Sequence, residues 1–194
     1  KVVQMVAELK EKLPRKLHIG GQQAHPEWEI FNAVSAPCVD YLGNANDLSQ
    51  FPEGSFVALY ASHVLEHFDH AGELGGVLKE WHRVLRLGGR LYISVPDMDK
   101  LARLFLTKEG FSFNDRIWVM RMMFGGHIDE HDYHKVGLNR EILEHYLTNA
   151  GYETVLSGKM HFVGPDQLHG FKKRLVRNIY PSDFQWVNHS TRDG

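Results

Sequence analysis

The fold is decided by one stretch of the sequence, SFVALYASHVLEH, which runs from Ser55 to His67. Its first part, Phe56 to Ala61, is an uninterrupted apolar run, as expected of a central parallel strand that is covered on both faces. The residues just before it, Pro52-Glu53-Gly54-Ser55, have the composition of a turn. The strand therefore starts at Phe56, and Ser62-His63 lies at its carboxyl end.

The sequence after this stretch predicts a helix and another strand. Glu73 to Leu87 is predicted as a helix that ends at Gly88-Gly89, and Arg90 to Val95 as a strand that ends before Pro96. One face of the helix is apolar at helical spacing. This face comprises Leu74, Val77, Leu78, Trp81, Val84 and Leu85.

The sequence before it predicts a helix over Val2–Leu13 and three short strands, at Leu17–Gly21, Glu29–Val34 and Val39–Gly43. Only residues 22–28 separate the first two strands. A parallel crossover normally takes about a dozen residues or more and usually contains a helix. We therefore expect the first crossover helix to be cut down or lost.

Beyond the sheet strands, residues 101–124 are rich in Phe, Met and Trp and are predicted to be helical, and residues 125–137 form a loop. A helix over Arg140–Asn149, capped by Asn139, precedes a late strand at Tyr152–Leu156. A short helix at 172–177 and a final antiparallel edge strand at 184–188 follow. The alternation predicts an α/β fold with a mostly parallel, doubly wound sheet and helices on both faces.

We expect residues 1–194 to form one domain. Its core spans about 15–160, a rim or lid insertion covers 101–135, and a C-terminal extension covers 165–194. The 22 basic and 24 acidic residues give a net charge of −2, which argues against nucleic acid and membrane partners. Cys38 is the sole cysteine, which favours a reducing, cytoplasmic setting. Whether the chain forms a homodimer is left open by the sequence.

Two segments resemble the class I S-adenosylmethionine-dependent methyltransferases. The first runs from Asp47 to His67 and corresponds to the family's "DLPFPDNSFD" and "SHVLEH" wording, and the second, Trp81 to Asp97, contains its "RVLKPGG" turn as RVLRLGG. The resemblance covers about Leu17 to Leu156 and implies a Rossmann-like fold and S-adenosylmethionine as cofactor. It is closest to a short branch with a trimmed first helix.

The resemblance also implies a cofactor site beyond the carboxyl ends of the strands, where ligands bind in open parallel sheets. Gly20 and Gly21 are expected at the methionine end, because backbone N–H groups without a neighbouring Cβ can approach a carboxylate. The adenine edge is assigned to the Asn44 side chain and the Ala45 N–H. Ser62 and His63 end the central strand beside them.

Two positions depart from the family pattern. Gln22 stands where a second glycine is usual, and the second strand ends in Asn32-Ala33-Val34 without the acidic residue that holds the ribose. Asn32 is expected to make one ribose bond instead. These departures keep a third class open beside the enzyme, a non-catalytic pseudo-methyltransferase that acts as a binding module.

For catalysis we predict His134 as the base that takes the acceptor proton, with His67 next to it. Histidines that cap helices or bind carboxylates are the competing interpretation. Histidines and acids also crowd two loops, at 63–70 and 127–134, but there is no thiolate support and no standard zinc spacing. We therefore predict no metal.

The predicted activity is a biosynthetic transferase reaction, in which a methyl group passes from S-adenosylmethionine to an oxygen or nitrogen of a small molecule or glycan. A lyase or cyclase that uses the same cofactor is the enzymatic alternative, because a sulfonium also undergoes elimination and ring closure.

Overall fold

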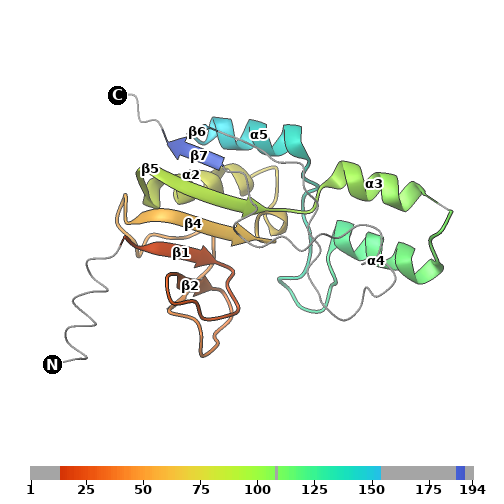
Figure 1. Ribbon diagram of the computed structural model, residues 1–194, viewed down its shortest axis with the longest axis horizontal. Coiled ribbons are helices and arrows are strands. Elements are labelled where there is room, and N and C mark those ends of the chain that lie inside the picture. The colour runs from red at the N-terminus through yellow and green to blue at the C-terminus, as the bar shows by residue number, and fades with distance from the viewer. Residues whose placement is uncertain (1–13, 108, 154–186, 191–194) are drawn as a thin grey trace.

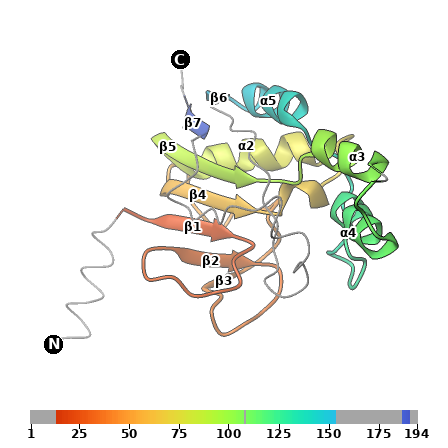
Figure 2. The ribbon, with the colours of Figure 1, turned by 45° about the vertical axis from the view of Figure 1, so that its right-hand side comes forward.

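The computed structural model describes residues 14–107, 109–153 and 187–190. Its sheet has the strand order β3-β2-β1-β4-β5-β7-β6, and the first five of these strands are parallel (Figures 1 and 2). These five are β1 (Lys16–Ile19), β2 (Glu29–Asn32), β3 (Tyr41–Leu42), β4 (Phe56–Ser62) and β5 (Leu85–Ser94). The Rossmann-like, mostly parallel and doubly wound sheet is confirmed.

The C-terminal strands differ in place from the prediction. An antiparallel strand is present as β7 (Val187–Ser190), but it lies inside the sheet, between β5 and the short edge strand β6 (Tyr152–Glu153). Long-range pairing with β5 sets this position, and a local pattern of residues cannot show it. The predicted helices at 2–13 and 172–177, and the C-terminal extension apart from β7, lie outside the described residues.

The connection between β1 and β2 contains no helix, although the two strands are parallel, with Leu17 opposite Glu29. The loss of the first crossover helix is thus confirmed. A positive φ of 78° at Gly20 turns the chain out of β1, and an isolated bridge between His25 and Trp28 leads it back into β2.

Helix α2 (Leu74–Val84) ends earlier than predicted. Leu85 is already extended, with φ −74° and ψ 134°, and it pairs with Phe56 as the first residue of β5. The apolar spacing through Leu87 therefore continues into a strand. The Gly88-Gly89 pair, expected to end the helix, lies within β5 instead, because pairing with β4 outweighs the local helix signal.

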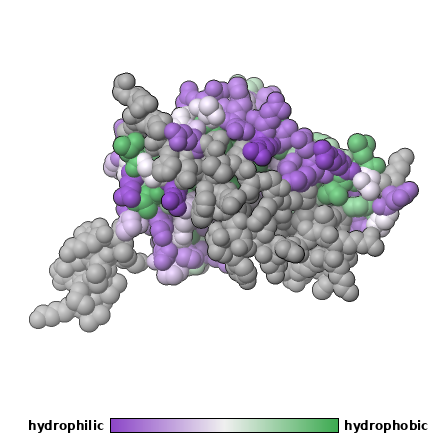
Figure 3. Space-filling model, turned by 45° about the horizontal axis from the view of Figure 1, so that its top comes forward, coloured by the Kyte–Doolittle hydropathy of each residue, from purple (hydrophilic) through white to green (hydrophobic). Residues whose placement is uncertain are grey.

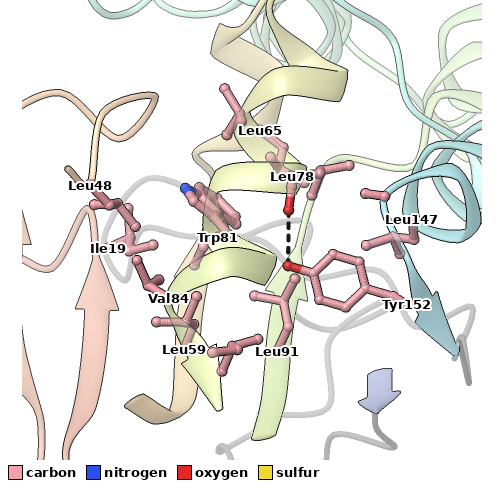
Figure 4. Close-up of a cluster of buried hydrophobic side chains, with 14 of the residues drawn as sticks. Ile19, Leu48, Leu59, Leu65, Leu78, Trp81, Val84, Leu91, Leu147 and Tyr152 are labelled. Carbon is pink, nitrogen blue, oxygen red and sulfur yellow. Dashed lines mark hydrogen bonds between the residues drawn. The ribbon is translucent and has the colours of Figure 1, made fainter. Parts of the chain in front are cut away.

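The core lies between the sheet and one helical face. Helices α2 and α5 (Arg140–Asn149) contribute to a single buried cluster with strands β1, β4 and β5. Figure 4 shows Trp81 of α2 above Leu59 and Val84, and the Tyr152 hydroxyl donates to the carbonyl oxygen of Leu78 at 3.1 Å. The predicted helix at 140–149 and its Asn139 cap, which accepts from the Ile142 N–H, are confirmed.

Two further helices, α3 (Met98–Leu106) and α4 (Phe113–Phe124), lie beyond the carboxyl ends of the strands (Figures 1 and 2). They pack on each other around Leu101 and Val119, so part of the Phe and Met content is a small second core. Hydrophobic surface also appears at this end in Figure 3. Two apolar side chains of these helices, Leu106 and Phe113, are each 76% exposed. The rim or lid insertion over residues 101–135 stays a prediction.

His18 on β1 gives the stability of the fold a pH dependence. Burial lowers the pKa of His18 from 6.5 to about 4, with a smaller contribution from His25. The unfolded chain therefore binds more protons between these values. Stability is full above about pH 6.5 and falls by about 2 kcal/mol toward pH 4, after discounting partial exposure.

The test is urea denaturation between pH 4 and 7 of the parent chain and of His18→Phe, which keeps a ring against Tyr60 at the site of the 4.6 Å contact. The slope is expected to flatten in His18→Phe and to persist in His70→Ala, where an exposed histidine is removed. Equal slopes in His18→Phe and the parent would contradict the assignment.

Candidate functional site

A cavity of about 400 Å³ opens at the carboxyl ends of β1, β2 and β4. This volume lies in the range of small-molecule sites, and open parallel sheets bind ligands at this edge. Six of the nine residues predicted from the sequence as site residues line it. They are Gly20, Asn32, Asn44, Ala45, His63 and His67.

The wall from β1 and β2 is built differently from the prediction. The Gly20 N–H donates to the carbonyl oxygen of Phe31 at 2.8 Å, so this donor holds the two strands together rather than facing a ligand carboxylate. Gly21 is buried behind the wall and does not line the cavity. Its carbonyl oxygen accepts from the Asn32 side chain at 2.8 Å. The Asn32 amide keeps a second N–H for a ligand.

The adenine-side loop is held from below by the core. The Trp81 ring donates from Nε1 to the carbonyl oxygen of Ala45 at 2.7 Å. Trp81 is fully buried, so this bond fixes the position of the Asn44–Ala45 loop relative to the core. Asn44 is exposed at the cavity, and its Oδ1 accepts from the Asn46 N–H at 3.3 Å. Asn44 and Ala45 both line the cavity, and their assignment to the adenine edge stays a prediction.

Strand β4 ends in a left-handed turn at His63, which has φ 56°. A non-glycine residue in this region is uncommon and marks a constrained site. The His63 Nδ1 lies 3.0 Å from Glu66 Oε1, and its backbone N–H donates to Ser94. Ser62, also predicted as a cofactor residue, does not line the cavity and pairs with Ser94 of β5 instead.

The two predicted catalytic histidines meet. His67 ends the short 3₁₀ turn η1 (Leu65–His67), and His134 lies in the loop after α4, yet their rings are 5.0 Å apart. His67 lines the cavity, and His134 lies behind it. The loops are tied together because the Glu66 carbonyl oxygen accepts from the Lys135 N–H at 2.8 Å.

The environment of His134 favours the neutral form of its imidazole. Burial lowers the pKa of His134 from 6.5 as the largest effect, while the nearby Glu66 carboxylate opposes it. His67 and His63 lower the pKa further, and a hydrogen bond to the Met122 backbone raises it. A neutral imidazole has one nitrogen lone pair, which is the form needed by a base or by a metal ligand.

Two parts of this site were not assigned to it from the sequence, although both lie in loops that the sequence marks as rich in histidines and acids. Glu66 is 1% exposed and lies between His63 and His67, so its spacing within the HVLEH motif was the available signal. The loop from Ile128 to Tyr133 also lines the cavity, opposite the strand ends. This loop reaches the site only through the tertiary fold.

Comparison with known proteins agrees with the resemblance read from the sequence. Residues 5–93, just under half of the chain, match the model of a family described as "Methyltransferase domain", a range that holds β1 to β4 and most of the cavity's strand-end wall. This part of the chain is therefore similar to a methyltransferase domain. The cavity at the strand ends has the size of a small-molecule site, as S-adenosylmethionine, the cofactor that the resemblance implies, requires.

Solved structures similar to this chain include a SAM-dependent methyltransferase from Thermotoga maritima, with 20% identity, a TM-score of 0.49, and coverage of 78% of this chain and 70% of that one. Another from Archaeoglobus fulgidus has 15% identity and a TM-score of 0.47, with coverage of 78% and 66%.

One curated protein matches over a short range. A stretch of 43 residues, 22% of this chain, is 70% identical to a choline-sulfatase of Rhizobium meliloti (strain 1021). It spans only 8% of that protein's length. In the part of the chain that the structure describes, no helix is both long enough and apolar enough to cross a membrane.

Proposed function

We propose that this domain transfers a methyl group from S-adenosylmethionine to an oxygen or nitrogen of a small molecule or glycan. One observation supports the proposal: a single cavity is lined both by strand-end residues predicted for the cofactor and by His67, in a chain whose residues 5–93 match a methyltransferase domain. Methyl transfer depends mainly on aligning the nucleophile with the methyl group, and one cavity that takes both partners serves this need.

The acceptor end is assigned to His67 and His134. The loop of residues 128–133 contributes Asp129, His131 and Tyr133 to the wall of the same cavity. These side chains offer hydrogen-bond donors and acceptors to a polar acceptor, as hydroxyl groups of a glycan or a polar small molecule require. The cofactor end, with Asn32, Asn44 and Ala45, has no carboxylate among these three residues.

The first test is calorimetric titration of the full chain with S-adenosylmethionine, followed by mass spectrometry of the spent cofactor with a panel of candidate acceptors. We expect one binding site per chain and S-adenosylhomocysteine as the product. Methylthioadenosine would favour the lyase or cyclase alternative, and absence of binding would favour the non-catalytic one.

The variant His134→Ala is expected to lower turnover by about 100-fold while the dissociation constant of S-adenosylmethionine changes less than about twofold, because His134 lies behind the acceptor end and not among the strand-end residues. His70→Ala is the control, since His70 is exposed and does not line the cavity. Turnover that is equal in His134→Ala and His70→Ala would remove His134 from the acceptor site.

A further inference from the structure

Three side chains from two distant loops converge at the acceptor end of the cavity. One carboxylate oxygen of Glu66 and one ring nitrogen each of His67 and His134 lie within 4.8 Å of one another. His67 belongs to the turn after β4, and His134 to the loop after α4. Among the described residues, this group alone brings three such side chains so close.

Each histidine is already held in the orientation that leaves one nitrogen for a ligand. The His67 Nδ1 lies 3.1 Å from the carbonyl oxygen of Tyr133, and a ring nitrogen of His134 bonds the backbone of Met122. A carbonyl oxygen only accepts, so each ring donates through that nitrogen and keeps its lone pair on the other. Metal-binding histidines are fixed by such carbonyl contacts in the same way.

Glu66 supplies the second, independent observation. Its side chain is 2% exposed, and one oxygen, Oε1, lies 3.0 Å from His63 Nδ1. The other oxygen, Oε2, is buried and accepts no hydrogen bond from a described residue. A buried carboxylate oxygen without a partner costs free energy. A cation bound beside this oxygen would remove that cost.

We propose that Glu66, His67 and His134 form a binding site for one divalent transition-metal ion, which places the sequence-based prediction of no metal in question. Two imidazoles and one carboxylate are a known donor set for zinc and ferrous iron, with positions left open for water or substrate. Imidazole donors disfavour Mg²⁺ and Ca²⁺, which select oxygen ligands. Bonds of about 2 Å draw the three atoms slightly closer together.

The role of this ion rests on the proposed methyl transfer, whereas its binding does not. The ion coordinates a hydroxyl group of the acceptor and lowers the pKa of that hydroxyl group, and the proton passes to water. The acceptor oxygen then forms a bond to the methyl carbon, the carbon–sulfur bond breaks, and its electron pair stays on sulfur as the sulfonium becomes a thioether. His67 and His134 act as ligands in this scheme, which replaces the base role predicted from the sequence.

The experiment is a titration of the chelator-treated full chain with Zn²⁺, followed by calorimetry, and with Co²⁺, followed by visible absorption. We expect one ion per chain with micromolar or tighter affinity, and no heat with Mg²⁺. Glu66→Gln keeps the size of the side chain and removes its charge, and His67→Ala removes a half-exposed ligand. Circular dichroism of each variant checks that the fold is kept. Each is expected to weaken Zn²⁺ binding by at least about tenfold.

His70→Ala is the matched control, because it removes an exposed histidine from the same loop. Unchanged affinity in both Glu66→Gln and His67→Ala, or an equal loss in His70→Ala, would overturn the site, and so would absence of stoichiometric binding. Binding of S-adenosylmethionine to the metal-free chain is measured separately. Loss of that binding alone would overturn the proposed function and leave the metal site standing.

Discussion

Trp81→Ala is expected to lower the free energy of unfolding by about 3–5 kcal/mol. Trp81 is 0% exposed and belongs to the buried cluster that also holds Leu59 and Val84 (Figure 4). Its removal leaves a cavity that the surrounding helix and strands cannot close. Since small domains are stable by only about 5–15 kcal/mol, this variant loses a large share of its total stability. Urea denaturation followed by circular dichroism measures the change.

Trp81→Phe separates packing from hydrogen bonding. Phenylalanine keeps most of the ring, but it lacks the Nε1–H that donates to Ala45, so the carbonyl oxygen of Ala45 loses its 2.7 Å partner. We expect a smaller loss, about 1–2 kcal/mol, together with weaker binding of S-adenosylmethionine because the adenine-side loop is freed. A cost below about 1 kcal/mol for Trp81→Ala would show that this ring does not organise the core.

Gly20→Ala is expected to have the largest effect on cofactor binding among single changes at the strand ends. Gly20 has φ 78°, and an added Cβ lies 2.7 Å from Val64 Cγ2. A side chain in this conformation costs about 1–3 kcal/mol, and the contact pushes Val64 into the cavity that both residues line. We expect the dissociation constant of S-adenosylmethionine to rise about tenfold, as measured by calorimetry.

Gly75→Ala serves as the matched control for Gly20→Ala. Gly75 lies within α2, and an added Cβ there meets no atom within 4 Å. Alanine in a helix is favoured over glycine by about 0.5–1 kcal/mol, so this variant is expected to be more stable and to bind the cofactor normally. Equal cofactor affinity in the two variants would show that the Gly20 turn tolerates a side chain.

The sequence predicted the local elements well where one strong local signal dominates. The apolar run at 56–61 predicted β4 to within one residue, and Asn139 predicted the start of α5. Both signals are local, because a buried strand and a helix cap each depend on residues that are neighbours in the sequence. The short link after β1 likewise predicted a missing helix, since chain length limits any crossover. Helix α2 was overextended because its apolar spacing does not reveal where pairing with β4 begins.

The candidate site, too, was predicted in part from local sequence and decided in part by the tertiary structure. The order of strands and their turns placed Gly20, Asn32, Asn44 and His63 at one edge, because parallel strands end together. The role predicted for the Gly20 N–H differs from the one in the structure. This N–H donates to the carbonyl oxygen of Phe31 within the sheet and is therefore not available to a ligand. Local sequence indicates where a turn lies but not which of its donors the fold consumes.

By itself, the stretch from Ser55 to His67 predicted the central strand and the position of the cavity at its end, and together with Trp81 to Asp97 it carried the resemblance to the methyltransferases. The tertiary structure alone decided that β7 enters the sheet between β5 and β6, and that the His67 ring meets the carbonyl oxygen of Tyr133, 66 residues away. The physical reason is the same in both cases. Contacts between distant segments depend on the packing of the whole chain, and no local spacing of residues encodes them.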